Sequence, residues 1–208
     1  CMLESRIHNM SKTPKLAKSL AEDLITANQI LVKQGVLDVF GHLSIRDPDH
    51  SAIFWLPTSI PPSRVSLGNL YPFNLEAEPV IKTEAELFSE RFIHSEIYRR
   101  FPDVNAICHH HSPSIMPFCI TGSKLFAVSQ TGAFLAEGVP QWDSQDEHGD
   151  TKLLIDDRQK AKSLARSMKG TSTLLLRGHG MVQIGCQLQE LVHKCVFACR
   201  EAETILSA

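Results

Sequence analysis

Apolar residues recur every three or four positions in the longest patterned stretches of this chain, which is the spacing of one helix face. The first such stretch follows Thr13 and Pro14, a pair typical of a helix start, and ends before Gly35. Comparable patterns follow further along the chain. The helices that they predict cover residues 13–34, 89–101, 112–119, 158–168 and 187–206.

Shorter apolar segments predict β-strands. They cover residues 40–46, 53–56, 79–81, 104–111, 126–128, 173–176 and 181–184, whereas the turn-rich segment 69–79 predicts a connection. Strands and helices do not alternate strictly, and short turns join several neighbouring strands, so an antiparallel sheet is favoured over a doubly wound parallel one. We therefore expect an α/β protein with one three-layer α/β/α domain and a mostly antiparallel central sheet.

Length, charge and cysteine usage narrow the class of protein. The 208 residues suit one domain, and we assign residues 1–12 to a flexible N-terminus and residues 13–208 to a catalytic domain. The formal net charge of −2 and the scattered basic residues argue against nucleic-acid binding. No apolar run approaches a membrane span, and the first residues show no secretory signal region. Six cysteines without a CxxC pair are typical of reduced thiols, so we expect a cytoplasmic protein.

Three consecutive histidines, 109 to 111, end the apolar segment that begins at Val104. On a strand, alternation places His109 and His111 on one face and His110 on the other. Two imidazoles on one face can share a metal ion, and imidazole suits zinc, iron, nickel and copper. A bare triplet also fits a polar strand end or a surface cluster, so the decision rests on the residues around it.

Two further motifs add candidate ligands. Glu90 and His94 lie four residues apart on a predicted helix that leads directly into the histidine strand, although such a pair can also be a solvated surface pair. His179 lies between two glycines, which permit a tight turn and a close backbone approach. It would supply the third imidazole of a metal site with open positions.

Together these motifs resemble the class II aldolase/adducin family, whose zinc lyases carry Glu-xxx-His, His-x-His-Ser-Pro and a later His-Gly. The matching residues are Glu90, His94, His109, His111, Ser112, Pro113, His179 and Gly180. The resemblance implies one divalent metal per subunit, most often zinc and otherwise manganese, cobalt or iron. It implies His109, His111 and His179 as ligands, and Glu90 as the catalytic carboxylate that ligates or exchanges protons. It also implies a homotetramer.

The chain departs from the sugar-phosphate aldolases of the family in their phosphate-binding segments. His42 replaces the asparagine of a Gly-Asn-Leu/Ile-Ser segment, and Ile60 follows Ser59 where the family has glycine. A phosphate nest needs exposed N–H groups in a conformation that isoleucine resists. Segments 40–46, 90–94 and 132–140 instead resemble a divergent branch with decarboxylases of aromatic hydroxy acids, such as dihydroxyphthalate decarboxylases, and a non-haem iron oxygenase.

The favoured function is a metal-dependent carbon–carbon lyase that decarboxylates a non-phosphorylated hydroxy or oxo acid. Retro-aldol cleavage, an Fe(II)/O₂ oxygenase and a non-catalytic adducin-like module are the alternatives. We expect a small-molecule substrate, with no nucleic-acid or membrane partner.

Four further residues are candidates for positioning this substrate or the metal ligands. His42 would hydrogen-bond a ring hydroxyl or carboxylate, although it can also be a core histidine. Arg46 or Arg91 would pair with a carboxylate, although Arg91 equally suits a subunit interface. His94 would orient a ligand.

Overall fold

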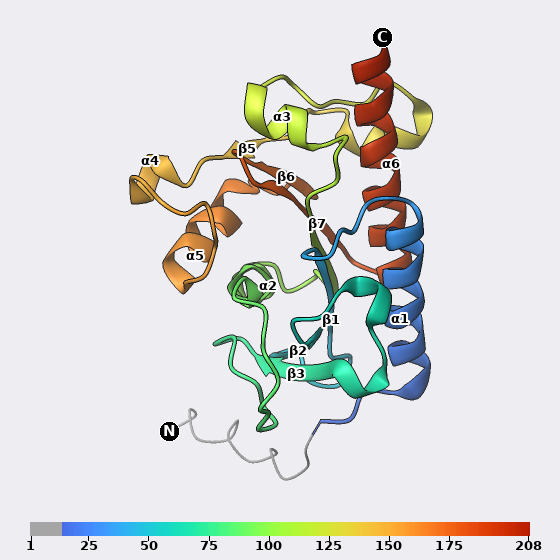
Figure 1. Ribbon diagram of the computed structural model, residues 1–208, viewed down its shortest axis with the longest axis vertical. Coiled ribbons are helices and arrows are strands. Elements are labelled where there is room, and N and C mark those ends of the chain that lie inside the picture. The colour runs from blue at the N-terminus through green and yellow to red at the C-terminus, as the bar shows by residue number, and fades with distance from the viewer. Residues whose placement is uncertain (1–13) are drawn as a thin grey trace, which may run out of the picture.

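A seven-stranded sheet forms the centre of the computed structural model, which describes residues 14–208 (Figure 1). The strand order is β3-β2-β1-β4-β7-β6-β5, and every neighbouring pair is antiparallel except β5 and β6. The expected mostly antiparallel sheet is confirmed, and its last pair makes it mixed. The strands are β1 (His42–Arg46), β2 (Ile53–Pro57), β3 (Leu70–Asn74), β4 (Ala106–His110), β5 (Gln141–Trp142), β6 (Thr173–Leu176) and β7 (Gly180–Gly185).

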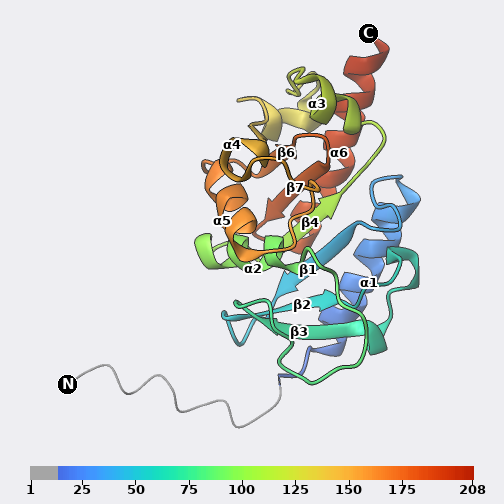
Figure 2. The same ribbon diagram turned by 60° about the vertical axis from the view of Figure 1, so that its left-hand side comes forward.

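Helices cover both faces of this sheet, so the expected three-layer α/β/α class is confirmed. The long helices α1 and α6 lie side by side on one face, and α2 and α5 lie on the other (Figures 1 and 2). The α-helices are α1 (Lys18–Lys33), α2 (Arg91–Arg100), α3 (Met116–Thr121), α4 (Gln145–His148), α5 (Arg158–Ser167) and α6 (Leu188–Ser207). Within residues 14–208, no helix combines the length and the hydropathy needed to cross a membrane.

Strand alternation divides the apolar core between the two faces. In β4, Ala106 and Cys108 pack into the cluster under α1 and α6, whereas Ile107 packs into the cluster under α2 and α5. Each fully buried leucine or isoleucine contributes about 1.5–3 kcal/mol of hydrophobic free energy. The two clusters therefore fix the register of β4, and with it the face on which each histidine of the triplet lies.

Some element boundaries differ from the predicted ones. The connection expected at 69–79 contains β3, and the strand expected at 79–81 is reduced to one bridge between Phe73 and Pro79. β3 is an edge strand and pairs with β2 alone. Pro72, which lacks a backbone N–H, can therefore lie in it. The strand expected at 126–128 is absent from the described fold, since the N–H of Val128 donates to the buried Glu201 carboxylate.

The helix ends also differ. The first helix begins at Lys18, after its predicted start, and the last one ends one residue after its predicted end. The short helix expected at 112–119 is displaced to α3. Thr13, the predicted cap, and the N-terminus expected to be flexible, 1–12, lie outside the described residues.

Candidate metal centre

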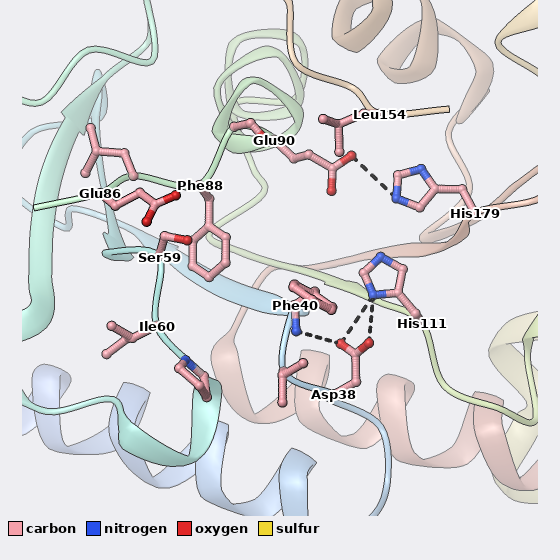
Figure 3. A pocket seen from close by; sticks show the side chains of 14 residues that line it. Asp38, Phe40, Ser59, Ile60, Glu86, Phe88, Glu90, His111, Leu154 and His179 are labelled. Carbon is pink, nitrogen blue, oxygen red and sulfur yellow. Dashed lines mark hydrogen bonds and ion pairs between the residues drawn. The ribbon is translucent and has the colours of Figure 1, made fainter. Parts of the chain in front are cut away.

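Four side chains from three parts of the chain meet on the α2 side of the sheet. Glu90 is the residue before α2, His109 and His111 come from the end of β4, and His179 comes from the turn between β6 and β7. The atoms through which they could bind a metal all lie within 4.8 Å of one another. Figure 3 shows Glu90, His111 and His179 facing the same space, with Glu90 joined to His179.

The distances among these atoms are those of ligands around one cation. The Nε2 atom of His109 lies 3.0 Å from Nε2 of His111 and 3.3 Å from Nε2 of His179. The Glu90 carboxylate lies 3.4 Å from Nε2 of both His109 and His179. Donors at about 2.0–2.1 Å from one tetrahedral zinc ion are separated by about 3.3 Å. The four residues therefore have the spacing of a zinc site.

Hydrogen bonds at the far side of two rings set their tautomers. Nδ1 of His109 donates to the carbonyl oxygen of Met181 at 3.0 Å, and Nδ1 of His111 lies 3.3 Å from both carboxylate oxygens of Asp38. With the protons on Nδ1, the two Nε2 atoms present lone pairs to each other. Such a pair repels unless a cation lies between the nitrogens, so this donor set fits a divalent metal.

The carboxylates beside the imidazoles are ionised at neutral pH. Burial on its own raises the pKa of Glu90, but His109 and His179 outweigh burial and hold this pKa well below its usual range. Burial likewise raises the pKa of Asp38, and His111 with the N–H groups of Gly41 and Phe40 outweighs it and lowers the pKa. Both residues therefore supply negative charge to the cluster.

The glycines around His179 have a steric reason. A Cβ atom on Gly180 would lie 2.5 Å from the carbonyl oxygen of His110 and 2.8 Å from the ring of His111. Gly178 adopts a positive φ of 65°, which side chains other than glycine rarely adopt. The turn can therefore bring His179 against β4 only with glycine at these positions.

A pocket of about 570 Å³ opens above the cluster. His111, His179 and Glu90 form part of its wall, and none of its lining residues, all within 14–208, is lysine or arginine. The rest of the wall is mainly apolar, with two carboxylates at its edge (Figure 3). The apolar lining residues are Val39, Phe40, Ile60, Pro61, Leu87, Phe88 and Leu154.

His110 lies on the opposite face of β4, as alternation predicts. Its ring is fully buried, and Nε2 lies 3.3 Å from the side-chain oxygen of Gln183. Burial lowers its pKa to about 3, so the ring is neutral at pH 7. The structure places it away from the other two histidines of the triplet.

His42 and His94 lie next to the cluster and contact each other. Nδ1 of His42 lies 2.6 Å from Nε2 of His94, and both rings are buried. Burial lowers the pKa of His94 to about 3 and lowers that of His42 well below its usual value, so both are neutral. His94 contacts His42 and Ser44 and no metal-facing nitrogen, so its expected effect on a ligand is at most indirect.

The structure does not bring the two candidate arginines to the pocket. The Arg46 guanidinium donates to four backbone carbonyl oxygens, those of Val104, Ser51, Tyr98 and Phe101, and so fastens α2 to β1 and β4. Arg91 donates to the carbonyl oxygens of Ala77 and Phe88. Both guanidinium groups therefore hydrogen-bond to backbone carbonyl oxygens of the fold, and neither residue lines the pocket.

Sequence reasoning did not find Asp38 or the aromatic wall of the pocket. Asp38 belongs to no recognisable motif, and it reaches His111 only because the loop after α1 folds back beside β4. Phe40 and Phe88 come from separate loops, and both line the pocket (Figure 3). No local sequence signal indicates such contacts.

A three-layer sheet protein in which three imidazoles and a carboxylate from separate elements meet on one face of the sheet defines a class of candidate metalloenzymes. The chain belongs to the class II aldolase/adducin family, because the family model described as Class II Aldolase and Adducin N-terminal domain matches residues 22–206. The resemblance inferred from the sequence motifs is thereby confirmed. Membership in this family supports an enzyme. The cluster of Glu90, His109, His111 and His179 could bind its metal ion.

Two relatives and one solved structure illustrate the family. The chain is 31% identical to the decarboxylase tropJ of Talaromyces stipitatus over 86% of this chain and 72% of that protein. It is 24% identical to a 3,4-dihydroxyphthalate decarboxylase of Arthrobacter keyseri over 84% of this chain and 73% of that protein. An L-fuculose 1-phosphate aldolase from Glaciozyma antarctica shares the fold with a TM-score of 0.77 at 23% identity, over 95% of this chain and 78% of that one. The relatives support lyase activity of the decarboxylase type.

Proposed function

We propose that this protein is a metal-dependent carbon–carbon lyase that decarboxylates an unphosphorylated aromatic hydroxy acid. The observation that carries the proposal is the position of the histidine–glutamate cluster at the wall of an apolar pocket without a cationic side chain. The names of the two decarboxylases among the relatives support the same reaction.

His109, His111 and His179 would hold the metal, with Glu90 beside it. A divalent ion bound there would stabilise the negative charge that develops on a substrate oxygen as the carbon–carbon bond breaks. Zinc suits the three imidazoles best, and manganese, cobalt or iron would fit the same donors.

Glu90 would move the proton. Its carboxylate is ionised before substrate binds, so it can accept a proton from the hydroxyl group of the substrate. The same carboxyl group then delivers this proton to the ring carbon that carries the carboxylate, which converts the hydroxyl-bearing carbon into a ketone. When CO₂ leaves, the electron pair of the broken carbon–carbon bond passes through the ring to that oxygen, and the product leaves as a phenolate. The proton balance closes on one residue, and Glu90 is again ionised at the end of the cycle.

The pocket wall selects the class of substrate. Phe40 and Phe88 offer faces for an aromatic ring, and Leu154 lies across from them next to Glu90 (Figure 3). A phosphate group would meet Asp38 and Glu86 without a lysine or arginine from the wall. These charges disfavour a phosphorylated sugar and leave the substrate carboxylate to be bound at the metal.

Assembly and location are further parts of the proposal. The family resemblance favours a homotetramer acting on a small molecule. Five cysteines of the described chain, Cys108, Cys119, Cys186, Cys195 and Cys199, are free thiols, which supports a reducing compartment such as the cytoplasm.

The test is incubation of the metal-loaded protein with a panel of dihydroxyphthalic, dihydroxybenzoic and 2-hydroxy acids, with and without oxygen. We expect CO₂ release in both atmospheres, and its loss in His179→Ala. His193→Ala, which changes an exposed histidine on α6, is the matched control and should retain activity. Iron-dependent oxygen consumption would overturn the lyase in favour of an oxygenase, and cleavage to an aldehyde without CO₂ would indicate retro-aldol chemistry.

A further inference from the structure

A buried chain of hydrogen bonds leads from α2 to His42. The Tyr98 hydroxyl lies 2.8 Å from Ser44 Oγ, and Ser44 Oγ lies 2.6 Å from Nδ1 of His94. Nε2 of His94 then lies 2.6 Å from Nδ1 of His42. All four side chains are at most 1% exposed. Within the described residues, Nε2 of His42 has no hydrogen-bond partner, although the atom is buried.

The chain can run in two directions, and they differ in cost. If Tyr98 donates to Ser44, Ser44 to His94 and His94 to His42, every hydrogen of the chain has an acceptor except the one on Nε2 of His42. In the opposite direction, Ser44 donates to Tyr98, so the Tyr98 hydrogen has no acceptor within the described residues, and Nε2 of His42 has a lone pair without a donor. Because a buried polar group without a partner is costly, the first direction is favoured.

We propose that His42 is a hydrogen-bond donor to an anionic oxygen of the bound ligand, held in its Nε2–H tautomer by the chain through His94, Ser44 and Tyr98. The substrate class rests on the proposed function, whereas the tautomer does not. His42 is thus a specificity-determining residue, and Ser44, Tyr98 and His94 are positioning residues.

The surroundings of His42 indicate what supplies the missing partner. Its ring centroid lies 5.2 Å from that of His109 and 4.6 Å from that of Phe88, which lines the pocket. His42 therefore packs against both a metal-facing ring and a residue of the pocket wall, although it does not line the pocket itself. A carboxylate or phenolate oxygen is the acceptor that gains most, because hydrogen bonds to charged groups are stronger than those between neutral groups.

Nitrogen NMR of the imidazole rings tests the tautomer without any reaction. In the zinc-loaded protein we expect the proton of His42 on Nε2 and that of His94 on Nε2. Ser44→Ala removes the donor to His94, so both rings should show mixed tautomers. Ser163→Ala changes another buried serine, on α5, and should leave both rings unchanged. A proton on Nδ1 of His42 in the unsubstituted protein would overturn the inference.

Ligand binding tests the role of that proton. Adding 3,4-dihydroxybenzoate should shift the Nε2 resonance of His42, and His42→Phe should bind this probe roughly tenfold more weakly, whereas His193→Phe should bind it as the unsubstituted protein does. An unchanged resonance together with unchanged affinity in His42→Phe would contradict the inference. If the probe shifts His42 but no acid of the panel releases CO₂, the proposed function fails and the inference about His42 stands.

Discussion

At the scale of single residues, the Nδ1 atoms of His109 and His111 determine which ring nitrogen is available to a metal. Met181 fixes one ring through its backbone and Asp38 fixes the other through its side chain, so only the second contact can be removed by substitution. A carboxylate behind an imidazole holds the ring in place and raises its basicity.

We predict that Asp38→Asn weakens metal binding by about 10- to 100-fold, because the amide cannot supply the charge that supports His111. Competition with a chromophoric chelator measures the effect. Asp103→Asn, at an exposed position, is the control. Equal affinities of Asp38→Asn and the unsubstituted protein would show that Asp38 does not support the ligand.

Buried neutral histidines make stability depend on pH. The pKa of His94 and of His110 is lowered by burial to about 3, below the unfolded value of about 6.5. The unfolded chain therefore binds more protons between these values, and stability present above pH 6.5 is lost as the pH falls toward 3.

For the metal-free protein, we predict that each of these histidines lowers the free energy of unfolding by about 1.4 kcal/mol per pH unit below pH 6. Urea unfolding at pH 7, 6 and 5 measures this slope. His110→Gln should reduce the slope by about 1.4 kcal/mol per pH unit, the contribution of one histidine. An unchanged slope would show that His110 is not a buried neutral histidine of this kind.

The sequence predicted part of this residue-scale picture. Alternation along a strand is local, so the separation of His110 from His109 and His111 follows from the triplet itself. The contact of Asp38 with His111 joins residues 73 positions apart, and the use of Arg46 by four carbonyl groups depends on how α2 packs. Contacts of this kind are set by tertiary structure and carry no pattern in the chain.

At the scale of elements, the turn between β6 and β7 positions the third imidazole. Gly180 allows this turn to lie against the backbone of His110 and the ring of His111. A methyl group there would displace the end of β4 or the turn, and with either of them the position of His179 relative to the other ligands.

We predict that Gly180→Ala lowers metal affinity by roughly tenfold or more, because the added Cβ atom meets the backbone of His110 and the ring of His111. Gly68→Ala is the matched control, because a Cβ atom there would meet nothing within 4 Å. Chelator competition on both variants makes the comparison. Equal affinities would mean that the turn adapts without moving His179.

The two strands that sequence reasoning missed share one property. β3 contains a proline and β5 has two residues, and both lie at the edges of the sheet. An edge strand needs only one neighbour, so its sequence is less constrained than that of β4 or β7, whose buried residues gave a clear pattern. The long helices α1 and α6 were predicted because each has one apolar side against the sheet.

At the scale of the whole molecule, the two core clusters and the metal cluster are built on the same strand. β4 pairs with β1 on one side and β7 on the other, so its histidines are held from both sides by the most buried part of the sheet. Because β4 is paired on both sides, it keeps the ligand nitrogens of its histidines at fixed positions. Proteins named as an aldolase and as a decarboxylase are both similar to this chain. The class of substrate is therefore inferred from the residues of the pocket wall and not from the fold.

We propose above all that His109, His111 and His179 hold one divalent metal ion, with Glu90 beside it. The most direct test is the metal content of the purified protein, measured by mass spectrometry of the digested sample for the unsubstituted chain, His179→Ala and His193→Ala. We expect one zinc or similar divalent ion per chain, retained in His193→Ala and lost in His179→Ala. A folded protein that binds no metal, or that binds it equally well without His179, would show that these residues do not form a metal site.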